Sequence, residues 1–161
     1  MRDSWRHFAA EFIGIFALVF VGGASIMASA MTHNANGLVV AAIAHGVILA
    51  IMVTATMRIS GHLNPAVTLG FLATRRIEPM MAMVYIVAQL LGAAVAAWAL
   101  KAVFPAEIAT ATRLGGQSVA IELSQVAFPG VRRADVNDVL MNTLGAALGF
   151  LAYRLAARAR A

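Results

Sequence analysis

The feature that most constrains the fold is the length of the stretches that carry no charge. Between Glu11 and Arg58 the chain has no Asp, Glu, Lys or Arg, and a second charge-free stretch covers residues 79–100. A helix needs about 20 apolar residues to cross the roughly 30 Å hydrocarbon core of a bilayer. Hydrophobic residues make up 61% of the chain and charged residues 12%, against about 45–50% and 25% in globular proteins. The sequence therefore predicts a membrane protein.

Four apolar stretches divide the chain into expected membrane spans. They cover about 8–31, 38–57, 80–103 and 136–154, and a region of mixed polarity at 104–135 connects the last two. Small residues spaced by four, which let helix backbones approach closely, occur at Ala42, Gly46 and Ala50, at Ala88, Gly92 and Ala96, and at Gly145 and Gly149. The expected fold class is all-α, a polytopic membrane helix bundle with about four transmembrane helices.

The orientation is predicted from the basic residues that flank the spans. With the N-terminus inside, the inner segments hold about twice as many of them as the outer segments: Arg2, Arg6, Arg58, Arg75, Arg76, Arg154, Arg158 and Arg160 against Lys101, Arg113, Arg132 and Arg133. The positive-inside rule then places both termini in the cytoplasm of a multi-pass cell-membrane protein. A secretory signal is the other interpretation of the N-terminus, but the apolar run at 12–31 exceeds the 7–15 residues of a signal core.

One polar segment between the second and third spans points to a function. Asn64 is a favoured helix N-cap and Pro65 a favoured first helical residue, so a helix should begin there and end near residue 73. At about 1.5 Å per residue it would be about 13 Å long, under half of the bilayer core. We interpret it as a re-entrant half-helix, which is tolerated only where it is buried in protein or lines a watery cavity. The alternative is a capped amphipathic helix on the cytoplasmic surface.

The direction of this half-helix suggests what could pass along it. A helix N-terminus carries roughly half a positive charge. At the membrane centre, that charge would repel cations, including protons, while the Asn64 amide could hydrogen-bond water or a small polyol. The predicted mechanism is passive conduction of neutral solutes.

Four motifs in order resemble one known family. The segments Ala-Glu-Phe-Ile-Gly-Ile-Phe at 10–16, Ala-His-Gly at 44–46, Ile-Ser-Gly-His-Leu-Asn-Pro-Ala-Val-Thr at 59–68 and Ala-Gln-Leu-Leu-Gly at 88–92 are similar to the first, second, re-entrant and third helices of the major intrinsic protein (aquaporin) family. The resemblance covers about 8–113. It implies that Asn64, Pro65 and Ala66 form the pore motif.

The same resemblance implies roles for three other polar residues. His45 would belong to the narrow selectivity filter, and Glu11 would be a buried residue that braces loop backbone. The alternative for His45 is a packing role, and for Gln89 we expect an interhelical hydrogen bond.

The chain departs from the family pattern in two places. It has no second Asn-Pro-Ala, and it has one residue fewer than usual between Gly61 and Asn64. The tail at about 118–154 instead resembles VanZ-like membrane proteins, which divides the chain into 1–113 and 114–161. In the tail, Asp135, Asp138 and Asn142 could form a site at the outer membrane surface, or could cap and orient a helix.

We therefore expect a channel for water or small neutral solutes such as glycerol, working as a homo-oligomer in the lipid bilayer. The alternative is a non-conducting VanZ-like module in which the aquaporin-like helices are a scaffold. No nucleophile and base are paired in the sequence, so an enzyme is not expected. With no cysteine and four scattered histidines, no metal or cofactor is expected. The arginines form no basic face for nucleic acid.

Overall fold

The computed structural model describes residues 4–115, and these residues form helices and connections with no strand among them. Three helices are long and apolar enough to cross a membrane: α1 (Ser4–Met31), α2 (Gly37–Thr56) and α4 (Pro79–Val103). Two are short: α3 (Pro65–Ala73) and α5 (Ala106–Ala111). The expected all-α membrane helix bundle is thus confirmed. The expected fourth span at 136–154 lies outside the described residues, and so do Asp135, Asp138 and Asn142.

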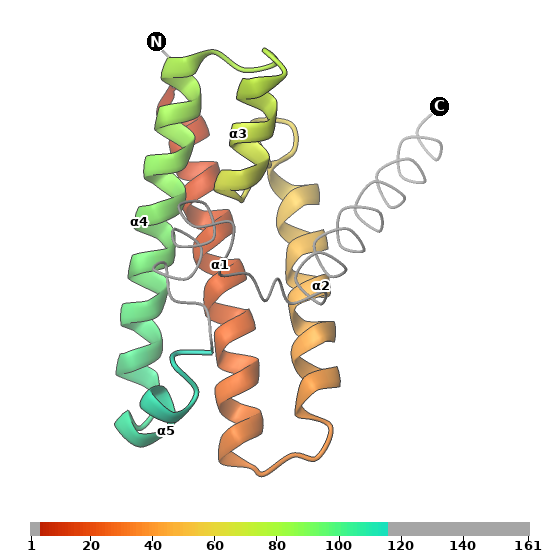
Figure 1. The fold of residues 1–161 in the computed structure, drawn as a ribbon, viewed down its shortest axis with the longest axis vertical. Helices are drawn as coiled ribbons and strands as arrows, with labels where there is room; N and C mark the ends of the chain where they lie inside the picture. Colours follow the sequence, from red (N-terminus) through yellow and green to blue (C-terminus); the bar gives the residue numbers. More distant parts are fainter. Residues whose placement is uncertain (1–3, 116–161) are drawn as a thin grey trace, which may run out of the picture.

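Helix α1 occupies the centre of the bundle. It packs along both α2 and α4, whereas within the described residues α2 and α4 do not contact each other. Figure 1 shows the three long helices running side by side, with α3 against α4 at the end where α1 begins. Two small hydrophobic cores join α1 to its neighbours. The first joins α1 to α4 and contains Ile15, Val19 and Ala96; the second joins α1 to α4 and α5 and contains Met27, Leu100 and Ala109.

The glycines show which of the expected close approaches exist. A Cβ added to Gly92 would lie 2.5 Å from the backbone oxygen of Phe12, so α4 meets α1 closely at this glycine. A Cβ added to Gly46 would meet nothing within 4 Å. The small-residue pattern in α4 is therefore a helix contact, whereas Gly46 of the pattern in α2 faces no described residue.

The helices differ from the expected organisation by more than one residue in two places. Helix α1 begins at Ser4, four residues before the expected span, because hydropathy marks only the part of a helix that lies in hydrocarbon. Helix α5 lies in what we expected to be a connection, and its six residues are too few to produce a clear periodic signal. The bounds of α3 are those expected from its cap and first residue.

Candidate functional site

The half-helix α3 begins inside the bundle and returns to the end from which α1 and α4 start (Figure 1). Asn64 has extended backbone (φ −160°, ψ 128°), and its Oδ1 accepts a hydrogen bond of 2.7 Å from the backbone N–H of Ala66. Pro65 follows at the first helical position. No described residue accepts a hydrogen bond from the Asn64 Nδ2 group. The cap therefore uses the oxygen of the amide and leaves its donor nitrogen for another partner.

The loop before α3 is held by the carboxylate of Glu11, which is fully buried on α1. Oε1 accepts from the backbone N–H groups of Gly61 at 2.9 Å and His62 at 2.8 Å. Oε2 accepts from the backbone N–H of Leu63 and from Nε2 of Gln89, each at 2.7 Å. A buried charge is costly unless it is fully hydrogen-bonded, and these four donors satisfy both oxygens. We call Glu11, residues 61–63 and Gln89 the loop clamp.

The clamp requires an unusual loop backbone. Gly61 has φ +108° and Leu63 has φ +49°, and an added Cβ on Gly61 would lie 3.1 Å from the Cα of Met57. The Leu63 side chain is buried against Gly14 of α1, where an added Cβ would overlap its Cδ2 at 2.3 Å. Three consecutive N–H groups therefore converge on one carboxylate although the loop is one residue shorter than the resemblance led us to expect.

Thr68 of α3 connects the clamp to the half-helix. Its Oγ1 accepts from Nε2 of Gln89 at 3.1 Å and lies 3.2 Å from the backbone oxygen of Asn64. Thr68 is fully buried, and Gln89 is buried with it. One amide group of α4 therefore joins α1 to α3. We did not single out Thr68 from the sequence, although its position four residues after Asn64, on an otherwise apolar helix, was a usable signal.

His62 is enclosed by polar and aromatic groups. Its Nδ1 lies 3.1 Å from Oγ1 of Thr68, and its ring lies 4.4 Å from that of Phe71 and 5.0 Å from that of Tyr85. The Tyr85 hydroxyl in turn lies 2.7 Å from Nδ1 of His7 on α1. The loop is thus held by aromatic packing as well as by the Glu11 carboxylate.

His45 lies at the contact between α2 and α1. Its Nδ1 lies 2.8 Å from the backbone oxygen of Ala41. A Cβ added to Gly22 would come within 2.3 Å of its Nε2, so the imidazole occupies the space that this glycine leaves. The contact with Gly22 is consistent with a packing role, and the filter role stays a prediction.

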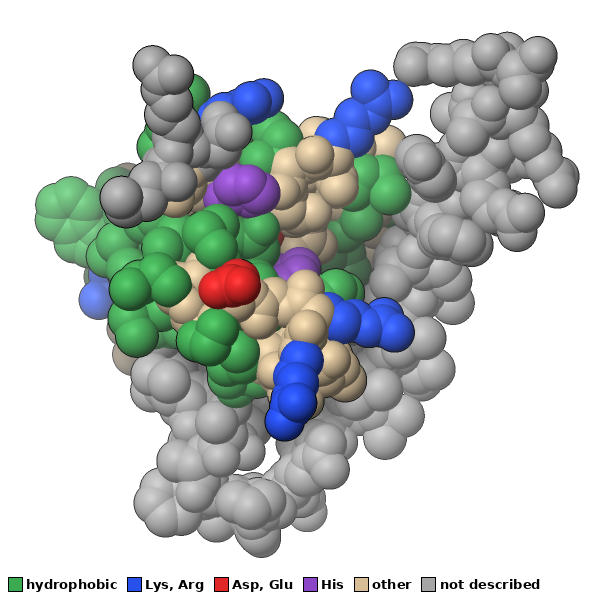
Figure 2. Space-filling view, turned by 90° about the horizontal axis from the view of Figure 1, so that it is seen from above, with side chains coloured by type: hydrophobic (Ala, Val, Ile, Leu, Met, Phe, Trp, Pro, Cys, Tyr) green, Lys and Arg blue, Asp and Glu red, His purple; other side chains and the backbone are tan. Residues whose placement is uncertain are grey.

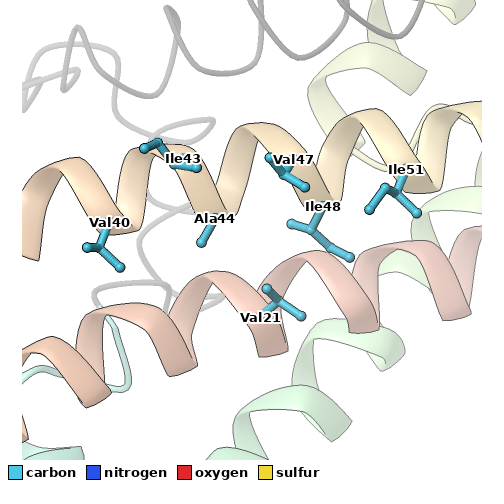
Figure 3. Close-up of a pocket in the computed structure, with 7 residues that line it drawn as sticks. All are labelled: Val21, Val40, Ile43, Ala44, Val47, Ile48 and Ile51. Atoms are coloured by element: carbon cyan, nitrogen blue, oxygen red, sulfur yellow. The ribbon is translucent and has the colours of Figure 1, made fainter. Parts of the chain in front are cut away.

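A groove lies between α1 and α2. It is lined by apolar side chains only (Figure 3): Val21, Val40, Ile43, Ala44, Val47, Ile48 and Ile51. Such a lining offers a polar solute no side-chain hydrogen bond. The polar groups that could contact a solute lie at Asn64 instead.

The comparison with protein families decides what this arrangement belongs to. The family model described as "Major intrinsic protein" matches residues 1–137, most of the chain. The chain belongs to the major intrinsic protein family. The match includes every helix described above and also the first part of 118–154, where we expected likeness to VanZ-like proteins. Neither the family match nor the relatives below support that likeness.

Individual major intrinsic proteins are similar to this chain over part of their length. Aquaporin NIP6-1 of Arabidopsis thaliana is 41% identical over 101 residues, which are 62% of this chain and 33% of the relative. Lens fiber major intrinsic protein of Lithobates pipiens is 44% identical over 65% of this chain and 39% of its own. Glycerol uptake facilitator protein-like 6 of Lactiplantibacillus plantarum is 42% identical over 68% of this chain and 49% of its own length. The chain thus spans between a third and a half of these relatives.

Proposed function

We propose that this chain forms one side of a membrane channel through which water or small neutral solutes such as glycerol pass without an energy source. One observation carries the proposal: the Asn64 side chain caps a half-helix inside the bundle with its oxygen, and its Nδ2 group donates to no residue within 4–115. The family membership supports the same function. The names of the relatives, an aquaporin and a glycerol uptake facilitator among them, indicate channels rather than enzymes.

The chemistry of the site favours neutral solutes. The N-terminus of α3 presents about half a positive charge, which opposes the passage of cations. The Asn64 Nδ2 group can donate to a water or hydroxyl oxygen, because Nδ2 carries two N–H donors. The Glu11 carboxylate would attract cations if it faced the path, but four donors satisfy it and it is fully buried.

Residues 4–115 by themselves leave one side of the proposed path without a wall. The sequence has a single Asn-Pro, at 64–65, and α2 and α4 do not contact each other within the described residues. We infer that further copies of this chain supply the missing wall in a homo-oligomer. Both termini would lie in the cytoplasm, with the channel in the cell membrane.

The alternative function, a non-conducting VanZ-like module, is disfavoured. The family match runs through residue 137 and so covers part of the tail on which that function depended. The pore roles of Asn64, Pro65, Ala66 and His45 belong to the channel proposal, as do the supporting roles of Glu11 and Gln89. The possible surface site at Asp135, Asp138 and Asn142 has no described contact to support it.

The channel proposal is tested with Asn64→Asp. Asp also caps helices well, so the fold should be kept, but a carboxylate has no N–H to donate and adds a negative charge to the path. The measurement is osmotic shrinkage of proteoliposomes, followed by stopped-flow light scattering, for water and for glycerol. We expect the substitution to reduce the protein-dependent rate at least tenfold.

Asn34→Asp is the matched control. Asn34 lies in the α1–α2 turn, is exposed, and accepts from the backbone N–H two residues on, as Asn64 does. This variant should conduct like the unmodified protein. Shrinkage of vesicles with folded, inserted protein at the rate of empty vesicles would refute the channel.

A further inference from the structure

One end of the bundle carries most of the positive charge of the described residues. Arg6, Arg58, Arg75 and Arg76 are exposed there, beside one acidic residue, Glu78. Figure 2 looks onto this end and shows Lys and Arg side chains projecting around its edge. Of the described residues, the opposite end has only Lys101 and Arg113 as basic side chains, with Glu107 as the acidic one. Nothing within residues 4–115 makes an ion pair or a side-chain hydrogen bond with Arg58, Arg75 or Arg76.

The backbone holds Arg75 in a conformation that suits glycine. The N–H of Arg75 donates to the oxygen of Leu72 at 3.0 Å, and the N–H of Arg76 to that of Phe71 at 2.8 Å. This pair of bonds is the Schellman motif, whose left-handed residue is usually glycine. Arg75 occupies it with φ +56°. An arginine thus occupies a position where glycine would be less strained.

The same motif occurs twice more among the described residues, at His33 after α1 and at Arg113 after α5, and shows that backbone strain alone defines no site. After α5, Arg113 has φ +49° and donates to the oxygen of Thr110 at 3.2 Å, and Leu114 donates to that of Ala109 at 2.8 Å. Arg113 differs from Arg75 in its surroundings, because no second arginine adjoins it. The distinguishing feature is therefore the gathering of Arg75 and Arg76, after α3, with Arg58, after α2, at one end.

We propose that Arg75 and Arg76, with Arg58 at the same end of the bundle, bind the headgroups of anionic phospholipids. The guanidinium group suits phosphate oxygens, to which it can donate two parallel hydrogen bonds. Each of the three arginines follows closely on an apolar helix, at the depth where lipid headgroups lie. The occupants are thus anionic lipids of the surrounding leaflet, with their phosphates at the arginines. This site does not depend on whether the chain conducts.

The test compares Arg75→Gly with Arg113→Gly. Each substitution removes one positive charge and relieves the same left-handed strain, so in neutral phosphatidylcholine nanodiscs both variants should melt no lower than the unmodified protein. The melting temperature is then followed as the share of phosphatidylglycerol increases. One basic residue near an anionic surface changes lipid affinity by about fivefold. Arg75→Gly should therefore need about fivefold more phosphatidylglycerol to reach half of the lipid-dependent increase in melting temperature. Arg113→Gly should need the same amount as the unmodified protein.

Three results would overturn the site. The first is an unchanged phosphatidylglycerol requirement in Arg75→Gly. The second is an equal shift of that requirement in Arg113→Gly, which would indicate a general effect of net charge. The third is equal stabilisation of the protein by inorganic phosphate in phosphatidylcholine nanodiscs, which would make free phosphate the ligand. The triple variant Arg58→Gln, Arg75→Gly, Arg76→Gln should abolish the preference for phosphatidylglycerol over phosphatidylcholine.

Discussion

Glu11 illustrates at the scale of a single residue how an ionisable group is accommodated inside a membrane helix. Its two oxygens accept from three consecutive backbone N–H groups and from the Gln89 amide, so its function in this structure is to position the loop at 61–63. The resemblance implied a bracing role. Which N–H groups it binds, and the share of Gln89 in binding it, are seen only in the structure.

Replacing Glu11 by Gln tests this account of the clamp. Gln keeps one acceptor oxygen and puts an N–H₂ group where an acceptor stood, so at least one buried N–H loses its partner. Each such loss costs about 1–3 kcal/mol, and we expect the free energy of unfolding to fall by about 2–4 kcal/mol. Equilibrium unfolding in mixed micelles with increasing dodecyl sulfate measures it. Glu107→Gln, on exposed α5, is the control and should change stability by less than about 0.5 kcal/mol. An equally small effect at Glu11 would contradict the clamp.

At the scale of elements, the contact between α1 and α4 is the one that determines where α3 lies. Helix α4 touches α1 at Gly92, supplies Gln89 to the clamp, and packs against α3. The spacing of small residues predicted close helix contacts in both α2 and α4, but it cannot show whether a neighbour is present. That is why Gly92 and Gly46 have the same sequence pattern and different surroundings.

The two glycines make a matched pair for a stability experiment. Gly92→Ala would place a methyl group 2.5 Å from a backbone oxygen of α1, which cannot move without separating the helices. We expect a loss of about 1–3 kcal/mol. The methyl group of Gly46→Ala meets no described atom within 4 Å, so this change should stabilise the protein by up to about 1 kcal/mol through helix propensity. Thermal unfolding in detergent compares them, and similar melting temperatures for both variants would show that the α1–α4 approach is looser than described.

At the scale of the whole molecule, the arrangement of the helices makes a prediction about topology. The α1–α2 turn lies at one end of the bundle, and the connection after α3 lies at the other (Figure 1). Because α3 enters from and returns to the same end, the residues on either side of it should be exposed on the same side of the membrane.

Cysteine labelling tests this topology, and the chain has no cysteine of its own. Asn34→Cys and Thr74→Cys replace exposed residues at opposite ends. In intact cells, a membrane-impermeant thiol reagent should label Cys at position 34 and reach position 74 only after the membrane is opened. Labelling of position 74 from outside would reverse the orientation, and labelling of both positions would contradict a single orientation.

The sequence by itself determined the membrane class, the three described spans and the half-helix. Each of these depends on local properties: the length of an apolar run, and the preference of Asn and Pro for the first positions of a helix. Tertiary structure decided how Glu11, residues 61–63, Thr68 and Gln89 meet, which glycines touch a neighbour, and where His45 packs. Those contacts join residues far apart in the chain, such as Glu11 and Gln89 at a separation of 78 residues. Their formation depends on how the helices pack, which no local preference specifies.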